Sequence, residues 1–394
     1  MLPDTDKSQP PPPDRALDLR RVRALSRGAG VTVAIVDTGV SPSSRLPGLT
    51  GGGDYMQTGG DGLFDCDAHG TLVAGIIGAA PDPADGFMGV APEARLVSIR
   101  YRSGAFNPDG AVNYDAAQAI SVQVRTLARA ITHAANLSAD VIVVALPICF
   151  SAALGVDQSM LAEAIGYAVR TRNALIVTGA GSSSGGGCEQ NPAIDPARPA
   201  DPRNWDGVTT ISTPGWFDAD VLSVGFTTAA GEPVGDSLTG PWVSLAAPGA
   251  GIESLGPGDT GLINGVGAPD KLVAVGGSSF SAAYVAGVAA LLKSRFPTEG
   301  PADIATRLRA SAHAPARGAD NAVGAGVIDP LAALSYRTPP LASAGVNRGA
   351  VLPIPDPPRP KDWRPAIVAL SVVLGSAVLT VVARMVPGWL RRRR

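Results

Sequence analysis

The amino-acid sequence predicts an α/β fold, a mostly parallel β-sheet with helices on both faces, followed by one transmembrane helix near the C-terminus. Short apolar runs rich in β-branched residues alternate with longer stretches of helical apolar spacing. This alternation is typical of parallel strands joined by crossover helices. The short runs are apolar throughout, as a sheet covered on both faces requires. Finally, residues 366–383 contain no charged residue.

The predicted strands and helices of the large domain follow one another between loops rich in Gly, Ser, Asp and Pro, which end each element. Strands are expected at residues 31–39, 94–101, 140–146, 174–180 and 221–226, and helices at residues 115–138 and 160–173. In such sheets, ligands bind beyond the carboxyl ends of the strands. The residues that end these runs are therefore the first candidates for a functional site.

The two ends of the chain have a different composition. Residues 1–14 are polar and proline-rich, which predicts an N-terminal arm that does not pack and is mobile or polyproline-like. The large domain is expected at residues 15–338, followed by a proline-rich linker at 339–362. Residues 363–390 form a predicted transmembrane region, because the 18 uncharged residues at 366–383 approach the ~20 that cross a bilayer. A buried core helix is the alternative interpretation.

The basic residues around the apolar run predict its orientation. Five arginines follow the run, four of them in a basic tail at 391–394, and three basic residues precede it. The positive-inside rule then predicts a single-pass protein of the cell membrane with a cytoplasmic C-terminus and an extracytoplasmic main domain. Such an orientation needs an export signal, yet no apolar run of signal-peptide length precedes Val31. We therefore expect that a leader or an N-terminal segment is missing from this chain.

Charge and cysteine content exclude several functions. The 394 residues carry 32 Lys and Arg against 34 Asp and Glu, so no basic field favours nucleic acid as a partner. The three cysteines show no CxxC spacing, which excludes a zinc cage or a thioredoxin-type motif. No cofactor and no metal site are expected, because the carboxylates near residue 69 (Asp61, Asp65 and Asp67) are interpreted as a solvated acidic loop.

Three polar residues stand in contexts that indicate catalysis. Asp37 ends the apolar run VAIVD, where a carboxylate can orient an imidazole. His69 precedes a helix of small residues, and Ser279 follows two glycines at the start of another, where the helix dipole favours negative charge on oxygen. Taken singly, Asp37 also fits a turn or cap, and Ser279 an N-cap. His133 and His313 are interpreted as structural or surface residues.

The three residues occur in the order Asp, His, Ser, at separations of 32 and 210 residues, which is the subtilisin order. Their contexts DTG, HGT and GSS resemble the subtilisin-like serine peptidases, over about residues 15–338. Within that superfamily the chain resembles the mycosins, membrane-anchored peptidases of actinobacterial type VII secretion systems. This likeness lies in DGLFDCDAHGTLVAGII around His69, CEQNP at 188–192, FSAAYVAG after Ser279, and the proline linker, single span and arginine-rich tail.

The resemblance implies an endopeptidase that cleaves a secreted protein or peptide by acyl transfer. Ser279 would attack the carbonyl, His69 would accept and return the proton, and Asp37 would hold the imidazole. It also implies the type VII secretion membrane complex as a partner. A structural component that stabilises this complex with little proteolysis is the alternative function. A soluble cytosolic peptidase with a buried C-terminal helix is a third, weaker interpretation.

Two departures from the subtilisin pattern predict weak activity or narrow specificity. Ser182, in GAGS, stands where subtilisins place the Asn that donates to the oxyanion, and loss of such a donor costs roughly a hundred- to a thousandfold in turnover. In the strand that subtilisins use to hold substrate, the matching residues are Ala145, Leu146 and Pro147. Pro147 has no N–H, so backbone pairing to a substrate is expected to be restricted.

The resemblance also implies the state of the cysteines. In mycosins a disulfide joins the positions of Cys149 and Cys188, and a second one ties the position of Cys66 to an N-terminal extension. The N-terminal segment of this chain contains no cysteine. Cys66 is therefore expected to lack its partner, which fits a missing N-terminal segment.

Overall fold

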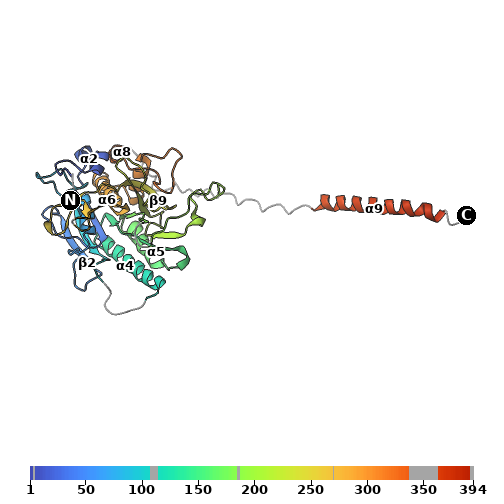
Figure 1. Cartoon of the computed structure of the whole chain (residues 1–394), viewed down its shortest axis with the longest axis horizontal. Coiled ribbons are helices and arrows are strands. Elements are labelled where there is room, and N and C mark those ends of the chain that lie inside the picture. Colours follow the sequence, from blue (N-terminus) through green and yellow to red (C-terminus); the bar gives the residue numbers. More distant parts are fainter. Residues whose placement is uncertain (3–4, 107–113, 184–186, 269, 337–362, 391–394) are drawn as a thin grey trace. The chain divides into compact units, whose positions relative to one another are not determined.

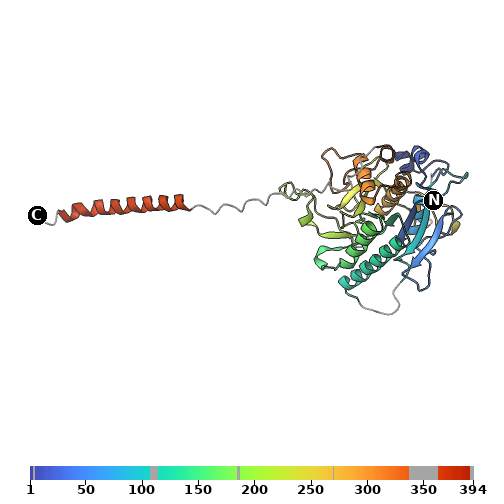
Figure 2. The same cartoon turned by 180° about the vertical axis from the view of Figure 1, so that it is seen from behind.

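The computed structural model of the protein describes residues 1–2, 5–106, 114–183, 187–268, 270–336 and 363–390. The chain forms two compact units, Met1–Pro340 and Leu341–Arg394, which are described separately (Figures 1 and 2). The first unit contains the sheet and all residues predicted to form the catalytic site. The second contains one helix in its described part.

A parallel sheet of seven strands forms the centre of the first unit, with the order β2-β3-β1-β4-β6-β8-β9. β1 lies between β3 and β4, so the residues that follow these three strands meet at one edge of the sheet. The strands are β1 (Thr32–Asp37), β2 (Leu49–Asp54), β3 (Arg95–Arg100), β4 (Val141–Val144), β6 (Leu175–Gly179), β8 (Val221–Thr227) and β9 (Val243–Pro248).

Five of the seven strands are the predicted ones, and the parallel arrangement is confirmed. β2 and β9 were not predicted, because their sequences, LTGGGD and VSLAAP, contain glycine, alanine and proline in place of β-branched runs. β2 needs its glycines for packing: a Cβ at Gly52 would lie 2.5 Å from Cγ1 of Val97 on β3. Close approach of neighbouring strands, which depends on tertiary structure, therefore decides this element.

Helices cover both faces of the sheet, as the continuous apolar strands predict. Val33 and Ile35 of β1 pack with α3 and α6, whereas Ala34 and Val36 pack with α4 and α5 on the opposite face, following the period of two in a strand. Figure 1 shows α4 and α5 on one side of the sheet and α6 and α8 on the other. The helices are α3 (His69–Gly78), α4 (Ala116–Asn136), α5 (Ser159–Gly166), α6 (Ser278–Arg295), α7 (Pro301–Ser311) and α8 (Pro330–Ser335).

Shorter elements complete the first unit. β5 pairs antiparallel with β7, β10 with β11, and β12 with β13. The predicted helix at 160–173 continues beyond α5 as one π-helical turn. These elements are β5 (Ile148–Ser151), β7 (Thr210–Thr213), β10 (Ser254–Leu255), β11 (Leu262–Ile263), β12 (Gly265–Val266), β13 (Val273–Ala274), η1 (Ala152–Leu154), η2 (Tyr167–Thr171), η3 (Trp205–Gly207) and η4 (Pro257–Asp259).

The N-terminal segment packs on the domain, so the prediction of an unpacked arm at residues 1–14 is wrong. Its prolines lead into helix α1 (Pro12–Ala16), which is followed by α2 (Leu19–Leu25). Proline suits the first turn of a helix because its φ is already close to the helical value and its missing N–H has no partner there. The carboxylate of Asp14 is buried and accepts hydrogen bonds from Tyr284 Oη of α6 at 3.0 Å and Arg23 Nη2 at 2.9 Å.

The described part of the second unit is helix α9 (Arg364–Leu390), which coincides with the predicted region 363–390. Its described side chains between residues 369 and 382 are exposed, and many are Leu or Val. Within the part of the chain that the structure describes, no helix combines the length and the apolar character that crossing a membrane requires. The predicted linker at 339–362 and the tail at 391–394 lie outside the described residues.

Candidate active site

The centre of the candidate site is the carboxyl end of β1. Asp37 is the last residue of this strand and is fully buried. Its Oδ1 accepts a hydrogen bond of 2.8 Å from the N–H of Thr38. The carboxylate is therefore held by the backbone that leaves the strand, and Asp37 caps no helix.

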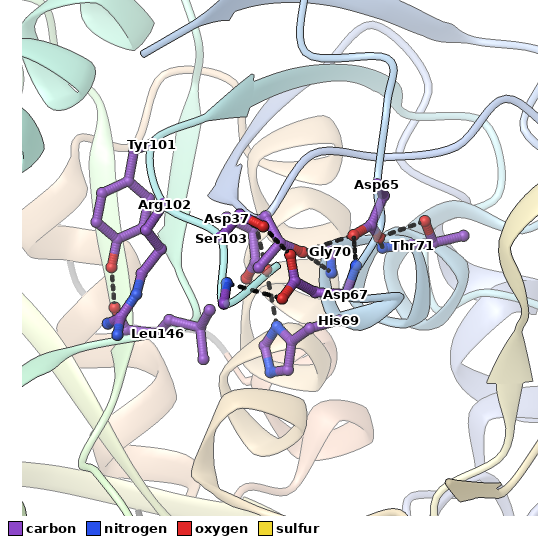
Figure 3. Close-up of polar contacts among 12 residues, drawn as sticks. Asp37, Asp65, Asp67, His69, Gly70, Thr71, Tyr101, Arg102, Ser103 and Leu146 are labelled. Atoms are coloured by element: carbon purple, nitrogen blue, oxygen red, sulfur yellow. Dashed lines mark hydrogen bonds and ion pairs between the residues drawn. The ribbon is translucent and has the colours of Figure 1, made fainter. Parts of the chain in front are cut away.

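His69 is the first residue of α3 and lies beside Asp37. Nδ1 of His69 is 2.7 Å from Oδ1 of Asp37, and the imidazole side chain is 19% exposed (Figure 3). The approach of α3 to β1 requires glycine after the histidine: a Cβ at Gly70 would lie 2.0 Å from the carbonyl oxygen of Gly39. The HGT context thus has a steric cause, since any side chain at this position would push His69 away from Asp37.

A buried aspartate that the sequence analysis placed in a solvated loop supports this pair. Asp65 is 6% exposed and accepts from Thr38 Oγ1 at 2.9 Å and from Thr71 through N at 2.9 Å and Oγ1 at 2.6 Å. The hydroxyl of Thr38 in turn accepts from the N–H of Gly70 at 3.0 Å. Asp65 therefore connects the threonine that follows Asp37 with the threonine that follows His69, as Figure 3 shows in part. The hydroxyls in DTG and HGT were the signal for this network.

Ser279 lies in the first turn of α6, near Ser182. A Cβ built on Gly277, whose φ is 143°, would lie 3.7 Å from Ser279 Oγ and 3.5 Å from Ser182 Oγ. The ring of Phe280, the next residue, is 5.2 Å from the ring of His69. Nε2 of His69 has no hydrogen-bond partner among the described residues. Asp37 and His69 are therefore in direct contact and the residue after Ser279 packs beside the imidazole, whereas no hydrogen bond joins Ser279 to Nε2 of His69.

The charges around His69 raise its pKa. Burial alone would lower the pKa of the imidazole, but the carboxylate of Asp37 opposes burial through its charge and its hydrogen bond. The charge of Asp65 acts in the same direction as Asp37, whereas the guanidinium of Arg102 lowers the pKa. The net result is a pKa of His69 above its usual value. A base of this kind is neutral, and able to accept a proton, only above that raised pKa.

The segment predicted to hold substrate follows β4. A Cβ at Gly179 would lie 3.1 Å from the carbonyl oxygen of Ala145 and 2.9 Å from Ser278 Oγ, so the segment starts beside α6. Tyr101 Oη donates to the carbonyl of Leu146, and Arg102 Nη1 lies 3.5 Å from that of Pro147. Neither Tyr101 nor Arg102 could be predicted from the sequence, because their role depends on contact between the ends of β3 and β4.

The cysteines and the other two histidines lie outside the catalytic contacts. Cys149 and Cys188 form the disulfide that the resemblance implied, and Cys66 is an exposed free thiol. His133 contacts the carbonyl of Gly52 through Nε2 at 2.6 Å, and His313 is mostly exposed. Both histidines thus have the structural or surface roles expected of them. The described residues include no group of three or more His, Cys, Asp or Glu side chains arranged to hold a metal.

The chain was compared with known proteins. The profile of the subtilase family (Peptidase_S8) matches residues 28–326. Mycosin-3 of Mycobacterium tuberculosis is 44% identical over 405 residues, covering 100% of this chain and 87% of the relative. The crystal structure of MycP1 from Mycobacterium smegmatis superposes with a TM-score of 0.83 at 45% identity, over 86% of this chain and 88% of that chain.

A further similar structure comes from a larger assembly. It is the periplasmic assembly from the ESX-5 inner membrane complex, which matches with a TM-score of 0.83 at 44% identity, over 91% of this chain and 92% of that chain. The residues matched by the family profile, 28–326, include Asp37, His69 and Ser279.

Proposed function

Since the chain belongs to the subtilase family and, within it, to the mycosins, we propose that it cleaves a secreted protein substrate by Asp-His-Ser acyl transfer within a type VII secretion system. The chain is a subtilisin-like serine peptidase by descent. The observation that carries the proposed mechanism is the 2.7 Å contact between Asp37 and His69, with Phe280, the residue after Ser279, packed against the imidazole.

Each of the three residues has a distinct role in the proposed reaction. Ser279 Oγ attacks the carbonyl carbon of the substrate as His69 Nε2 accepts the hydroxyl proton. The acyl-enzyme forms when the same proton passes from His69 to the leaving amine, and water repeats both steps to release the acid. Asp37 accepts from His69 Nδ1, which fixes the tautomer with a basic Nε2 and stabilises the imidazolium.

Oxyanion stabilisation is proposed to come from two groups of unequal strength. The N–H of Ser279 lies in the first turn of α6, where backbone donors have no intrahelical partner. The hydroxyl of Ser182 lies beside Gly277, 3.5 Å from where a Cβ of that residue would be. A serine hydroxyl is shorter than the amide of asparagine, so this second donor is weak and turnover is low.

Labelling with a fluorophosphonate tests the catalytic role, because the probe reports an activated serine without knowledge of the substrate. We expect the detergent-solubilised protein to be labelled and the Ser279→Ala variant to be unlabelled. Absence of labelling in both proteins, with the fold intact by circular dichroism, would contradict the proposed reaction.

A structural role in the secretion complex is the second candidate function. It is favoured by the donors that already occupy the carbonyls of Leu146 and Pro147, and by Ser182 in the oxyanion position. Comparison of a Ser279→Ala strain with a deletion strain separates the two functions. Secretion that persists in the first strain and fails in the second supports the structural role, whereas failure in both supports proteolysis.

Membrane attachment is proposed through α9. Support comes from the exposed apolar side chains of this helix, the basic residues after it, and the similar chain in a periplasmic assembly of an inner membrane complex. The proposed division is a peptidase domain at 15–338 outside the cytoplasm, a linker at 339–362, a single span within 363–390 and a cytoplasmic tail at 391–394. Alkaline washing of membranes should retain the full chain and release a chain that ends at residue 340; release of both would exclude the anchor.

A further inference from the structure

Arg102 lies in the wall of the candidate site, beside the segment proposed to bind substrate. It follows β3, which neighbours β1, and the N–H of the preceding Tyr101 donates to the carbonyl of Asp37 at 3.0 Å. Figure 3 shows Tyr101 and Arg102 reaching toward Leu146, on one side of His69. The guanidinium is thus close to the reacting groups without being one of them.

The backbone beside Arg102 has little hydrogen-bonding capacity left for a peptide. Pro147 carries no N–H, and its carbonyl faces Nη1 of Arg102 at 3.5 Å. The carbonyl of Leu146 accepts from Tyr101 Oη. A substrate that pairs with this segment as a β-strand would therefore lack a hydrogen-bond donor at Pro147, and the carbonyls of Leu146 and Pro147 would already be bonded to Tyr101 and Arg102. Recognition at this wall must rely on a side chain, and Arg102 offers the remaining donors of its guanidinium.

In the described ranges of the chain, Arg102 has no carboxylate in direct contact, although Tyr101 and the more distant charges of Asp37 and Asp67 raise its pKa. No ion pair joins it to a carboxylate among the described residues, whereas Arg100, two positions earlier, is buried and paired with Asp54. Asp67 is the nearest alternative in the chain, but its carboxylate accepts from Ser103 Oγ and from the N–H of Gly104 at 2.8 Å. Arg102 is only partly exposed. A half-buried cation whose counter-charges are not in direct contact can still form an ion pair with a ligand that brings a carboxylate.

We propose that Arg102 is a specificity-determining residue that binds an acidic side chain of the substrate, on the acyl side of the scissile bond. This inference rests on the proposed function. The acyl side follows from the position of the segment: it starts at Ala145, beside Gly179 and Ser278, whereas the leaving amine must face His69. The substrate class is therefore a peptide with Glu or Asp within a few residues before the cleaved bond.

Peptide phosphonates that react with the active serine test this proposal without knowledge of the natural substrate. Tetrapeptide diphenyl phosphonates carry Glu, Gln or Lys at one of the three positions before the residue that bears the phosphonate, with alanine elsewhere. In the wild-type protein we expect Glu to react faster than Gln by about tenfold to a hundredfold at one position, the worth of a hydrogen bond to a charged group.

The variants locate the preference. In Arg102→Gln, the probes with Glu and Gln should react at equal rates. Arg102→Glu should react fastest with the Lys probe, and Arg102→Lys should retain part of the preference for Glu. Each ratio is taken within one variant, so a general change in the reactivity of Ser279 cancels. Arg170→Gln, which alters an exposed arginine paired with Asp220, is the control and should leave the ratio unchanged.

The role of Arg102 would be refuted if the wild type reacted equally fast with Glu and Gln probes, or if Arg102→Gln kept the preference for Glu. Fluorophosphonate labelling would still support the peptidase activity in either case. If fluorophosphonate does not label the wild type, binding replaces reaction as the readout. Calorimetric titration with acetylated tetrapeptide amides containing Glu or Gln should then show a Glu preference that Arg102→Gln removes, and equal binding would reject the proposal.

Discussion

Among the individual residues, Asp65 influences the imidazole in two ways. Its hydrogen bonds connect the threonines that follow Asp37 and His69, and its charge raises the pKa of His69. A general base loses activity when it is protonated, so the acid limb of the rate profile follows the pKa of His69. The midpoint of the acid limb of this rate profile is therefore expected at a pH above the usual pKa of imidazole.

Asp65→Asn should lower the pKa of His69, because one of the two negative charges that raise it is removed. The acid limb of fluorophosphonate labelling should move to lower pH, measured as labelling rate against pH. Asp61→Asn is the matched control, since Asp61 is exposed in the same loop and, among the described residues, its carboxylate accepts only from the N–H of Leu63. An unchanged limb in Asp65→Asn would mean that Asp65 acts only by shaping the loop.

Ser182→Asn should raise the turnover of peptide substrates. Asparagine carries its donor further from the backbone, and an oxyanion donor is worth about a hundred- to a thousandfold in turnover. The expected gain lies in kcat, with KM little changed, because the donor acts on the transition state. Ser183→Asn, at the adjacent position, should have no effect on kcat. No rise in Ser182→Asn would show that another group already fills the oxyanion position.

At the level of elements, the sequence was sufficient where local pattern and tertiary environment agree. Both faces are buried in five strands, and the sequences of these strands are apolar runs: β1, β3, β4, β6 and β8. β2 depends on glycines that admit the side chains of β3, and the N-terminal segment depends on partners 270 residues away, such as Tyr284 for Asp14. Asp37, His69 and Ser279 were recognised from their contexts. Tyr101 and Arg102 were not, since their contacts join segments distant in sequence, and Asp65 was misplaced because Thr38 and Thr71 were not recognised as its partners.

The packing of α1 and α2 against α6 depends on a buried ion pair. The side chains of Arg23 and Asp14 are only 9% and 3% exposed and lie 2.9 Å apart. Arg23→Ala should lower the free energy of unfolding by about 3–5 kcal/mol, because it leaves the Asp14 carboxylate buried without its cation. Urea denaturation of the first unit, followed by tryptophan fluorescence, measures this change.

The control for that prediction is Arg21→Ala in the same helix. Arg21 pairs with Asp18 at the surface, where the two side chains are 65% and 41% exposed. Such a pair contributes about 0–1 kcal/mol. Similar losses in the two variants would mean that the buried pair contributes no more than a surface contact.

For the whole molecule, several carboxyl groups act on stability in the same direction. Burial raises the pKa of Asp14, of Asp65 and, from 4.5 to about 7, of Glu253. Between its unfolded and folded pKa values, each group binds more protons in the folded state than in the unfolded state. Stability therefore falls as pH rises through this range, and for Glu253 the window runs from 4.5 to about 7.

Glu253→Gln should flatten part of this dependence, because the amide does not titrate. Glu253 is 5% exposed, and its Oε1 has no hydrogen-bond partner among the described residues. The melting temperature of the wild type should be lower at pH 8 than at pH 5, and the difference should shrink in the variant. Glu232→Gln, at a mostly exposed site, should leave the difference unchanged. A wild type that is more stable at pH 8 would contradict this assignment.

The disulfide makes the segments that contain Pro147 and Ser182 sensitive to the redox conditions around the protein. Cys149 lies two residues beyond Pro147, and Cys188 six residues beyond Ser182, so one covalent bond links the two segments. A chain still in a reducing compartment lacks this tie. Catalytic competence would then arrive only after export, and the protein could not attack its neighbours during synthesis. Reductant should slow labelling of Ser279 at concentrations that leave the fold intact, and a Cys149→Ala, Cys188→Ala double variant should show no response.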